Sequence, residues 1–411
     1  MAPHSSPRDW RSFYSALVEQ QATLIERAGP LVAGFSATTD AVHRLSSADL
    51  QRLMLGTVGG SEAFRNGIAT LREWLRAGRD GELFIDDESG EELLEQLAGP
   101  PALLQCGGTS IQACWSWSAL GLQPLLSLQN RSARQLDATP PGVQVLGPSG
   151  PEPVRRAEAG DDAVVPSNHV LEFSRGTRGG DVTIERSSRI TVVLTRKRLQ
   201  MDERFLRDSP AHVRGGVALV SGLNGLGRAR EVVLPILAET VARWREAGAR
   251  LVHLELAEYS HGQELARVME IVGPHVQSVG MNGDELSRLV GPGTPAEAAH
   301  DFAQAHDLRR VVVHSDRWAM SVHRGDPRSE ERALAAGSLA AANRAESGQP
   351  RGVWTLPAAA SFAEGGPRSG SLGSGYHATV VSTPYLSAPH STIGLGDTFV
   401  SGDLLAQASP A

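Results

Sequence analysis

The sequence predicts an α/β protein with an open, mainly parallel sheet flanked by helices and a smaller β-sheet lid domain. Short apolar runs alternate with stretches of helical periodicity, as in parallel sheets whose strands are buried on both faces. A second group of segments alternates apolar and polar residues, which is typical of half-exposed strands. The length of 411 residues exceeds the ~250–300 at which single cores stop growing, so we expect one large domain and a smaller one.

The strands of the main sheet are expected at seven apolar runs: Pro30 to Ala37, Pro101 to Cys106, Gly216 to Ser221, Arg250 to Leu256, Val276 to Met281, Leu308 to His314 and Gly352 to Leu356. The helical patterns between them include Glu231 to Ala247, Gln263 to Val272 and Pro295 to His306. Because open α/β sheets bind ligands beyond the carboxyl ends of their strands, we expect the site there.

The alternating segments that predict small antiparallel strands are His169 to Gly176, Asp181 to Glu185 and Arg189 to Thr195, and Gly81 to Asp86 is expected to join them in a small sheet. We expect them to form a lid over the main site. Two Pro- and Gly-rich stretches, Ala138 to Pro166 and Gly365 to Gly375, are interpreted as loops. The expected division is 1–38, 98–165 and 205–411 for the large domain, with 39–97 and 166–204 for the lid.

Composition excludes several classes of function. The net charge of −7 argues against a general nucleic-acid-binding protein, which would carry a basic face. No uncharged apolar run approaches the ~18 residues that a membrane span needs. The segment Met1 to Trp10 lacks the basic-then-apolar layout of a secretory signal. We therefore expect a cytoplasmic protein that binds neither nucleic acid nor membrane.

Cysteine and lysine are scarce. Cys106 and Cys114 are too few for a disulfide framework and are interpreted as small buried apolar residues. Lys197 is the only lysine, so a GxxxxGK[ST] phosphate loop is absent. Any phosphate must be bound by arginine, backbone amides or metal.

The most informative motif runs from Ser391 to Gly402, where Gly394 and Gly396 form a turn and Asp397 opens an apolar helix. Unpaired backbone N–H groups at such a helix start can hold a phosphate or the charge that develops in phosphoryl transfer. An aspartate there is placed to accept a proton from a hydroxyl. The motif therefore predicts a kinase, although a simple turn and helix cap remains the alternative.

Several further blocks occur in a fixed order along the chain: Gly34 to Asp40, Gly107-Gly108, Leu171-Glu172-Phe173, Arg189-Ile190, Ser221 to Asn224, His253-Leu254-Glu255, Asn282 to Glu285, His314-Ser315 and Gly394 to Asp397. Together they resemble the ADP-dependent glucokinase and phosphofructokinase family of the ribokinase-like superfamily. The resemblance spans roughly residues 31–402. It implies a ribokinase-like fold whose large domain binds the nucleotide.

The resemblance implies a set of acceptor-binding residues: Asp40, Gly107, Gly108, Thr109 and Glu172. Asp40 would accept hydrogen bonds from acceptor hydroxyls. The alternative for Asp40 is the N-cap of a helix over Ala41 to Leu45. Thr109 stands where the family often has asparagine, which leaves that acceptor contact open.

The family's metal blocks correspond to Glu255 and Glu285, which the resemblance assigns to Mg²⁺. Magnesium suits such a site because it keeps several waters and takes only one or two carboxylates. A buried carboxylate at Glu255 should in any case face a cation or water. A surface cap or ion pair is the alternative for Glu285, and Glu258 is a nearby substitute for Glu255.

The nucleotide-binding residues that the resemblance implies are Arg189, Asn224, His314, Val381, Thr383 and Leu395. Arg189 would reach from the lid to the phosphates, since a guanidinium fork can bridge two phosphate oxygens. A solvated strand arginine is the alternative for Arg189. A core histidine is the alternative for His314.

The predicted function is transfer of the terminal phosphoryl group of a nucleotide to a sugar hydroxyl with Mg²⁺, with Asp397 as the base and Gly394 and Gly396 as the anion-binding turn. ADP is the expected donor and ATP the second choice. A neutral sugar is the first choice of acceptor, and a nucleoside or sugar phosphate the second.

A non-catalytic sugar or nucleotide sensor of the same fold is the competing class of function. A dehydrogenase is disfavoured because Gly222, Gly225 and Gly227 lack the required spacing. We expect a monomer.

Overall fold

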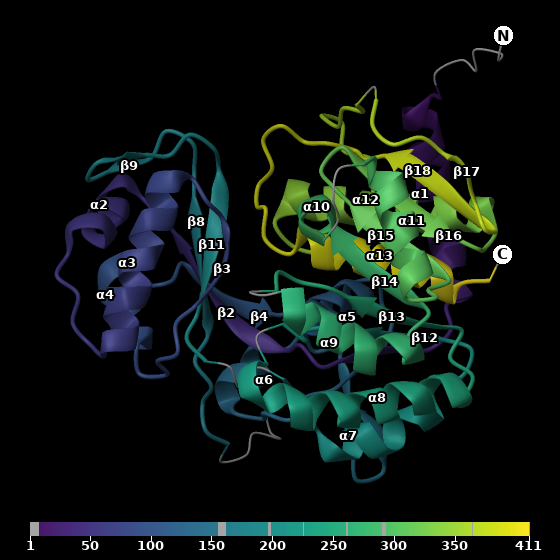
Figure 1. The fold of residues 1–411 in the computed structure, drawn as a ribbon, viewed down its shortest axis with the longest axis horizontal. Coiled ribbons are helices and arrows are strands. Elements are labelled where there is room, and N and C mark those ends of the chain that lie inside the picture. Colours follow the sequence, from purple (N-terminus) through teal and green to yellow (C-terminus); the bar gives the residue numbers. More distant parts are fainter. Residues whose placement is uncertain are drawn as a thin grey trace.

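Two separate sheets organise the chain (Figure 1). The structure is a computed structural model that describes residues 8–154, 162–195, 199–224, 226–259, 262–289, 293–363 and 365–410. The larger sheet has the order β17-β18-β16-β15-β14-β13-β12-β1-β5-β6-β7. Strands from β15 to β6 run parallel, and β16, β18, β17 and β7 are antiparallel additions at the two edges.

The strands of the larger sheet are short and mostly buried. Their bounds are β1 Leu31–Gly34, β5 Leu125–Leu126, β6 Gln144–Gly147, β7 Gly150–Pro153, β12 Val217–Val220, β13 Leu251–Glu255, β14 Ser278–Asn282, β15 Arg310–His314, β16 Trp318–His323, β17 Gly370–Gly373 and β18 Tyr376–Ser382.

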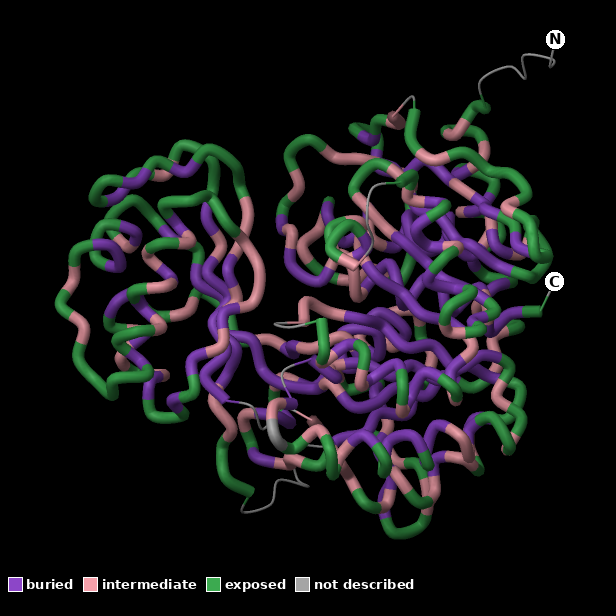
Figure 2. The backbone as a smooth tube through the Cα atoms, in the orientation of Figure 1, coloured by how far each residue is buried: buried purple, intermediate pink, exposed green. Residues whose placement is uncertain are grey.

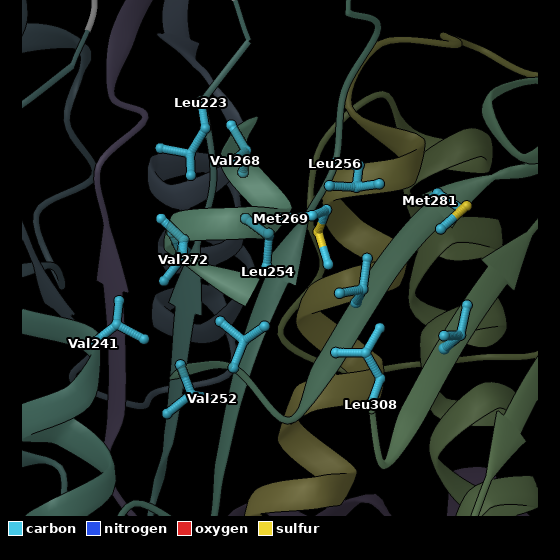
Figure 3. Packing of buried hydrophobic residues seen from close by; sticks show 14 of the residues in the cluster. Leu223, Val241, Val252, Leu254, Leu256, Val268, Met269, Val272, Met281 and Leu308 are labelled. Atoms are coloured by element: carbon cyan, nitrogen blue, oxygen red, sulfur yellow. The ribbon is translucent and has the colours of Figure 1, made fainter. Parts of the chain in front are cut away.

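Helices cover both faces of this sheet because successive side chains of each strand point to opposite sides. The helices are α1 Trp10–Glu26, α5 Thr109–Ala119, α6 Ala133–Ala138, α7 Glu203–Asp208, α8 Arg230–Glu246, α9 Gly262–Ile271, α10 Gly283–Leu289, α11 Pro295–Ala305, α12 Pro327–Ser347 and α13 Leu395–Ala408. Along β12, Ala218 and Val220 pack toward α8, while Val217 and Leu219 pack toward α12 and α13. Figure 3 shows the first of these cores, where Val241 of α8 and Met269 of α9 lie over the strands.

The smaller sheet has the order β3-β11-β8-β2-β4. Its strands are β2 Thr38–Arg44, β3 Gly81–Phe84, β4 Leu103–Gly107, β8 Asn168–Phe173 and β11 Ser188–Val193, with a separate pair β9 Arg178–Gly179 and β10 Val182–Thr183. Helices α2 Ser47–Leu55, α3 Glu62–Ala77 and α4 Glu91–Ala98 bury one face of the sheet in a third core. The opposite face of the small sheet is not covered by these helices and lines the candidate site. Figure 2 shows buried segments of the small sheet beside helices whose outer sides are exposed.

The expected fold class is confirmed, and the expected strands at 30–37, 216–221, 250–256, 276–281 and 308–314 all lie in the large sheet. The strand expected at 101–106 forms as β4, but it pairs antiparallel with β2 in the smaller sheet. An apolar run does not reveal which sheet it joins, and Leu103 and Leu104 are about half exposed because β4 is an edge strand.

Three other expectations are wrong. No strand forms at 352–356, because side-chain amides take the backbone donors: Trp354 N–H donates to Gln21 and Thr355 N–H to Asn343. The expected loops at 138–166 and 365–375 contain β6, β7 and β17. Asp40 lies in β2, so the alternative of a helix N-cap does not hold for this residue. The antiparallel pairing expected in the lid is present between β8 and β11 and between β9 and β10, while β3 and β2 join the same sheet parallel to β11 and β8.

No helix among the described residues is long and apolar enough to cross a membrane. The domain boundaries proposed from the sequence stay a prediction, apart from the placement of β4. Cys106 and Cys114 are both buried and unbonded, in agreement with their expected packing role.

Candidate active site

A cavity of about 380 Å³ lies between the two sheets. Its floor is formed where β12 to β15 end, and its roof is the uncovered face of β2, β3, β8 and β11. Eleven of the predicted site residues line it: Asp40, Gly108, Thr109, Arg189, Asn224, Glu255, Glu285, His314, Gly394, Gly396 and Asp397. Residues separated by more than 350 positions in the sequence therefore meet at the carboxyl ends of the parallel strands, as expected.

Asp397 stands in the first turn of α13, directly after a tight turn. Gly394 begins the helix with φ 65°, in the left-handed region that favours glycine. Burial raises the pKa of Asp397, while the hydroxyl of Thr109 and the positive charges of Arg344 and Arg189 act against that rise. Burial prevails and the pKa of Asp397 stays above its usual value, which suits a base at a helix start whose backbone N–H groups can bind an anion.

The acceptor end of the cavity is built on neighbouring strands of the small sheet. Asp40 of β2 lies opposite Asn168 of β8, and Asn168 Nδ2 donates to Asp40 Oδ1 at 3.1 Å and to Thr38 Oγ1 at 2.9 Å. Gly107 of β4 stands beside them, where any Cβ would overlap the Asp40 carboxylate. Gly107 therefore makes room for Asp40 and does not itself line the cavity.

Glu82 of β3 also lines the cavity, and the sequence analysis did not single it out. Asn224 Nδ2 donates to Glu82 Oε2 at 3.0 Å and to the Glu258 carbonyl at 3.2 Å. Asn224 thus spans the gap between the large sheet and the lid. The alternation of Gly81 to Asp86 was the only sequence signal that pointed to this acid.

Glu255 ends β13 and is held by two histidines. His253 Nε2 lies 2.9 Å from Glu255 Oε2, and His314 Nε2 lies 3.4 Å from Glu255 Oε1. Although burial favours the neutral acid, these hydrogen bonds outweigh it and lower the pKa of Glu255. Burial likewise opposes a charge on His314, but Glu255 outweighs it and raises the pKa of His314.

Glu285 lies at the start of α10, where Asn282 N–H donates to its carboxylate at 2.8 Å and Asn282 Oδ1 accepts from Glu285 N–H at 2.8 Å. Burial raises the pKa of Glu285 to about 7, and the nearby charge of Glu255 adds to the rise. Two acids that disfavour each other's ionisation form a site that a cation stabilises. They fit Mg²⁺, which needs only one or two carboxylates. No cluster of three or more metal-ligating residues exists among the described residues.

Arg189 reaches from β11 across the cavity, and its Nη1 donates to the Thr392 carbonyl at 3.0 Å. Thr392 lies two residues before Gly394, so the guanidinium stands beside the turn that leads into α13. Arg189 lines the cavity, whereas the next residue, Ile190, is buried in the lid core. The side chain of Arg189 therefore lies on the cavity side of β11.

Five of the predicted residues lie outside this cavity, and Gly107 is one of them. Glu172 lines a second cavity of about 560 Å³ near β4 and accepts from Ser391 Oγ at 3.2 Å. Val381 is buried in the core, Thr383 Oγ1 donates to the Asp316 carbonyl, and Leu395 is the first residue of α13. Their substrate and nucleotide roles stay predictions.

The conserved region of the ADP-specific phosphofructokinase/glucokinase family matches residues 68–296, more than half of the chain. The chain belongs to this family. Members of the ADP-specific phosphofructokinase/glucokinase family are sugar kinases, and the chain is accordingly a sugar kinase that uses a nucleotide phosphoryl donor. Kinases of this family generally use a divalent metal. No curated protein matches the chain.

Solved structures share the fold of this family member. A phosphofructokinase from Pyrococcus horikoshii OT3 with AMP is 18% identical, with a TM-score of 0.71 over 93% of this chain and 98% of that one. An ADP-dependent kinase in complex with fructose-6-phosphate and ADPβS is 16% identical, with a TM-score of 0.79 over 98% and 99%. The last common ancestor of ADP-dependent phosphofructokinases from Methanosarcinales is 15% identical, with a TM-score of 0.70 over 98% of each chain.

Proposed function

We propose that the chain transfers the terminal phosphoryl group of ADP to a hydroxyl of a neutral sugar, with Mg²⁺. The observation that carries the proposal is the meeting of Asp397, Asp40 and the Glu255–Glu285 pair in one cavity. A base, an acceptor-binding carboxylate and a cation site are the parts that phosphoryl transfer requires. Membership of the family supports a nucleotide donor and a sugar acceptor. The choice of ADP as the donor and of a neutral sugar as the acceptor goes beyond the family match.

In the proposed reaction the acceptor hydroxyl oxygen forms a bond to the terminal phosphorus as the bond from that phosphorus to its bridging oxygen breaks. Asp397 accepts the hydroxyl proton. Backbone N–H groups at Gly394 and Gly396 stabilise the charge on the transferred group, and Arg189 orients the phosphates from the lid. Mg²⁺, held near Glu255 and Glu285, supplies charge neutralisation for the phosphate oxygens when bound. Positioning and electrostatics carry most of such a reaction.

A neutral sugar is favoured over a sugar phosphate by the charges around the acceptor end. Among the described residues that line the cavity, the only arginines are Arg189 and Arg288, and Arg288 pairs with Glu258 at 2.7 Å. Asp40 and Glu82 instead offer acceptors for sugar hydroxyls. Arg196, Lys197 and Arg198, which the sequence analysis noted as a cationic cluster, lie outside the described residues.

ADP is favoured as the donor by the family and by its similar structures, of which one is an ADP-dependent kinase with ADPβS. ATP remains the second choice. A non-catalytic sensor would need neither Asp397 nor the two metal acids, so their presence in one cavity supports an enzyme. Monomeric state and cytoplasmic location remain expectations.

The test is a matrix of donors and acceptors. The purified chain is incubated with ADP or ATP, Mg²⁺ and a panel of neutral sugars, sugar phosphates and nucleosides, and products are identified by mass spectrometry. We expect a phosphorylated neutral sugar and AMP with ADP as donor. A sugar bisphosphate or a nucleotide product would support the alternative acceptors. Ligand binding without product from any pair would support the sensor.

A further inference from the structure

A buried arginine lies directly beneath the turn that precedes Asp397. Arg344 belongs to α12, its side chain is fully buried, and it does not line the cavity. A Cβ on Gly394 would lie 2.5 Å from both Cζ and Nη2 of Arg344. The guanidinium is therefore in contact with the left-handed residue that starts α13, so any other residue at 394 would displace it.

The hydrogen bonds of Arg344 are incomplete. Nη1 donates to Gln112 Oε1 at 2.8 Å and to Thr398 Oγ1 at 2.9 Å. Nε and Nη2 have no hydrogen-bond partner among the described residues. Leaving buried donors of a charged group unpaired is costly, and no carboxylate forms an ion pair with Arg344 among the described residues. Such an arrangement needs a reason beyond stability, because most buried charges are paired.

Arg310 shows what a structural buried arginine looks like in this chain. It is equally buried but donates to both Glu330 and Asp403. Its charge is neutralised by two carboxylates, whereas the charge of Arg344 is not. Among the charged groups that act on Arg344, Asp397, which stands one turn after Gly394, has the largest effect.

We propose that Arg344 is a positioning residue for phosphoryl transfer: its unpaired positive charge keeps Asp397 ionised and its contact with Thr398 fixes the Gly394 turn. Thr398 Oγ1, which accepts from Arg344, donates in turn to the Gly394 carbonyl at 2.8 Å. One side chain thus supports both the geometry of the turn and the charge of the base. This inference rests on the proposed role of Asp397.

The electrostatic surroundings agree with this role. The charged and titratable groups that act on Asp397 or feel its charge are Arg344 of α12, Arg189 of β11, Glu255 of β13, His314 of β15 and Cys106 of β4. Burial raises the pKa of Asp397, and Arg344 is the first of the two arginines that lower it. Arg344 belongs to α12 of the large domain, so its charge stays beside Asp397 whatever the position of the lid. Arg189 belongs to the lid.

The test compares Arg344→Met and Arg344→Lys through the pH dependence of kcat. Loss of a charge that acts at this range moves a carboxyl pKa by about one unit or more, so the acid limb of Arg344→Met should rise by at least that amount. Arg344→Lys should move the acid limb less than Arg344→Met does, because a lysine that stays protonated still supplies the positive charge. The control is Arg332→Met. Arg332 lies in the same helix as Arg344, and its guanidinium donates to the carbonyls of Ala406 and Ser409.

A purely structural role predicts a different result. Arg344→Met and Arg344→Lys would then lose the same activity with an unmoved acid limb, which would overturn the proposal. If Arg344→Met does not fold, the same measurement is made on Arg344→Gln, and an acid limb that does not rise overturns the proposal. Titration of ¹³C-labelled aspartate by NMR, with Asp397→Asn to assign the signal, measures the same shift without turnover. It separates failure of this inference from failure of the proposed kinase activity.

Discussion

His253 Nε2 lies 2.9 Å from Oε2 of Glu255, and this contact links the metal end of the site to the core of the large sheet. His253 Nδ1 in turn lies 2.8 Å from Ser278 Oγ on the neighbouring strand β14. The imidazole is thereby fixed between two strands of known register. Glu255 is presented to the cavity as an ionised carboxylate rather than a neutral acid.

The first prediction concerns the metal acids. Glu255→Gln and Glu285→Gln should each raise the Mg²⁺ concentration needed for half-maximal activity, because each removes a charged oxygen ligand. The exposed Glu270→Gln is the control. In the unaltered enzyme the Mg²⁺ requirement should also rise as the pH falls through about 7, since Glu285 takes up a proton there. Identical Mg²⁺ titrations for all variants would contradict the metal assignment.

The second prediction concerns the base. Asp397→Asn should lower kcat by roughly two to four powers of ten, the usual contribution of general acid–base catalysis. Nucleotide affinity should stay within a few-fold, because the lost proton acceptor acts in the transition state. Asp301→Asn, an exposed carboxylate on α11, should leave both unchanged. Steady-state kinetics and nucleotide titration measure the two effects, and near-normal turnover in Asp397→Asn would remove it as the base.

The third prediction concerns the lid arginine. Arg189→Ala should weaken transition-state binding of the donor by about 1.5–3 kcal/mol, which is one to two powers of ten in its kcat/KM. Arg189→Lys should recover part of the loss, because a point charge does not reproduce the two-pronged fork. Arg186→Ala is the control, since Arg186 is exposed and pairs with Asp80. A donor KM and kcat equal to those of the parent enzyme would place the phosphates elsewhere.

The fourth prediction concerns lid closure. The contacts that link the lid to the large domain include Arg189 with Thr392, Asn224 with Glu82, Ser391 with Glu172 and Arg79 with Glu258 at 3.7 Å, beside a small apolar cluster of Val42, Val170 and Ile393. Substrates that fill the cavity should add contacts and exclude water, so hydrogen exchange over His169 to Thr195 should slow with nucleotide and sugar together. Helix α8 is the internal reference because it lies on the outer face of the large sheet. Equal protection with and without ligands would contradict the lid interpretation.

The fifth prediction concerns a buried histidine pair in the lid. His43 Nε2 lies 2.9 Å from His169 Nδ1, and His43 Nδ1 lies 2.9 Å from the Gly99 carbonyl. Burial, with the neighbouring His169, lowers the pKa of His43 from 6.5 to about 4. The unfolded chain therefore binds the proton first, and the free energy of unfolding should fall between pH 6.5 and 4, by up to about 3 kcal/mol.

His43→Gln, which keeps a donor and an acceptor, should flatten this pH dependence by about 1 kcal/mol per pH unit. Urea denaturation at pH 7, 5.5 and 4.5 measures the slope. The exposed His377→Gln is the control and should follow the parent protein. Equal slopes for all three proteins would show that the pKa of His43 is the same in the folded and unfolded chain.

The sequence by itself determined the fold class, the strands that carry Glu255, Asn282 and His314, and the turn at Gly394. These features depend on local signals: apolar runs of strand length and a glycine that adopts a positive φ. The order of the motifs along the chain was also sufficient to indicate the family, because this order is visible in the sequence before the packing of the chain is known.

Only the tertiary structure decided which sheet β4 joins, that Asp40 lies in a strand, and that Glu172 faces a second cavity. Strand pairing is a long-range contact, and an edge strand such as Leu103–Gly107 has the same composition whichever partner it finds. The roles of Asn168, Glu82 and Arg344 were likewise invisible, because each depends on a contact between distant parts of the chain. Arg344 meets Gly394 across 50 positions of sequence only because α12 packs against α13 in the same core.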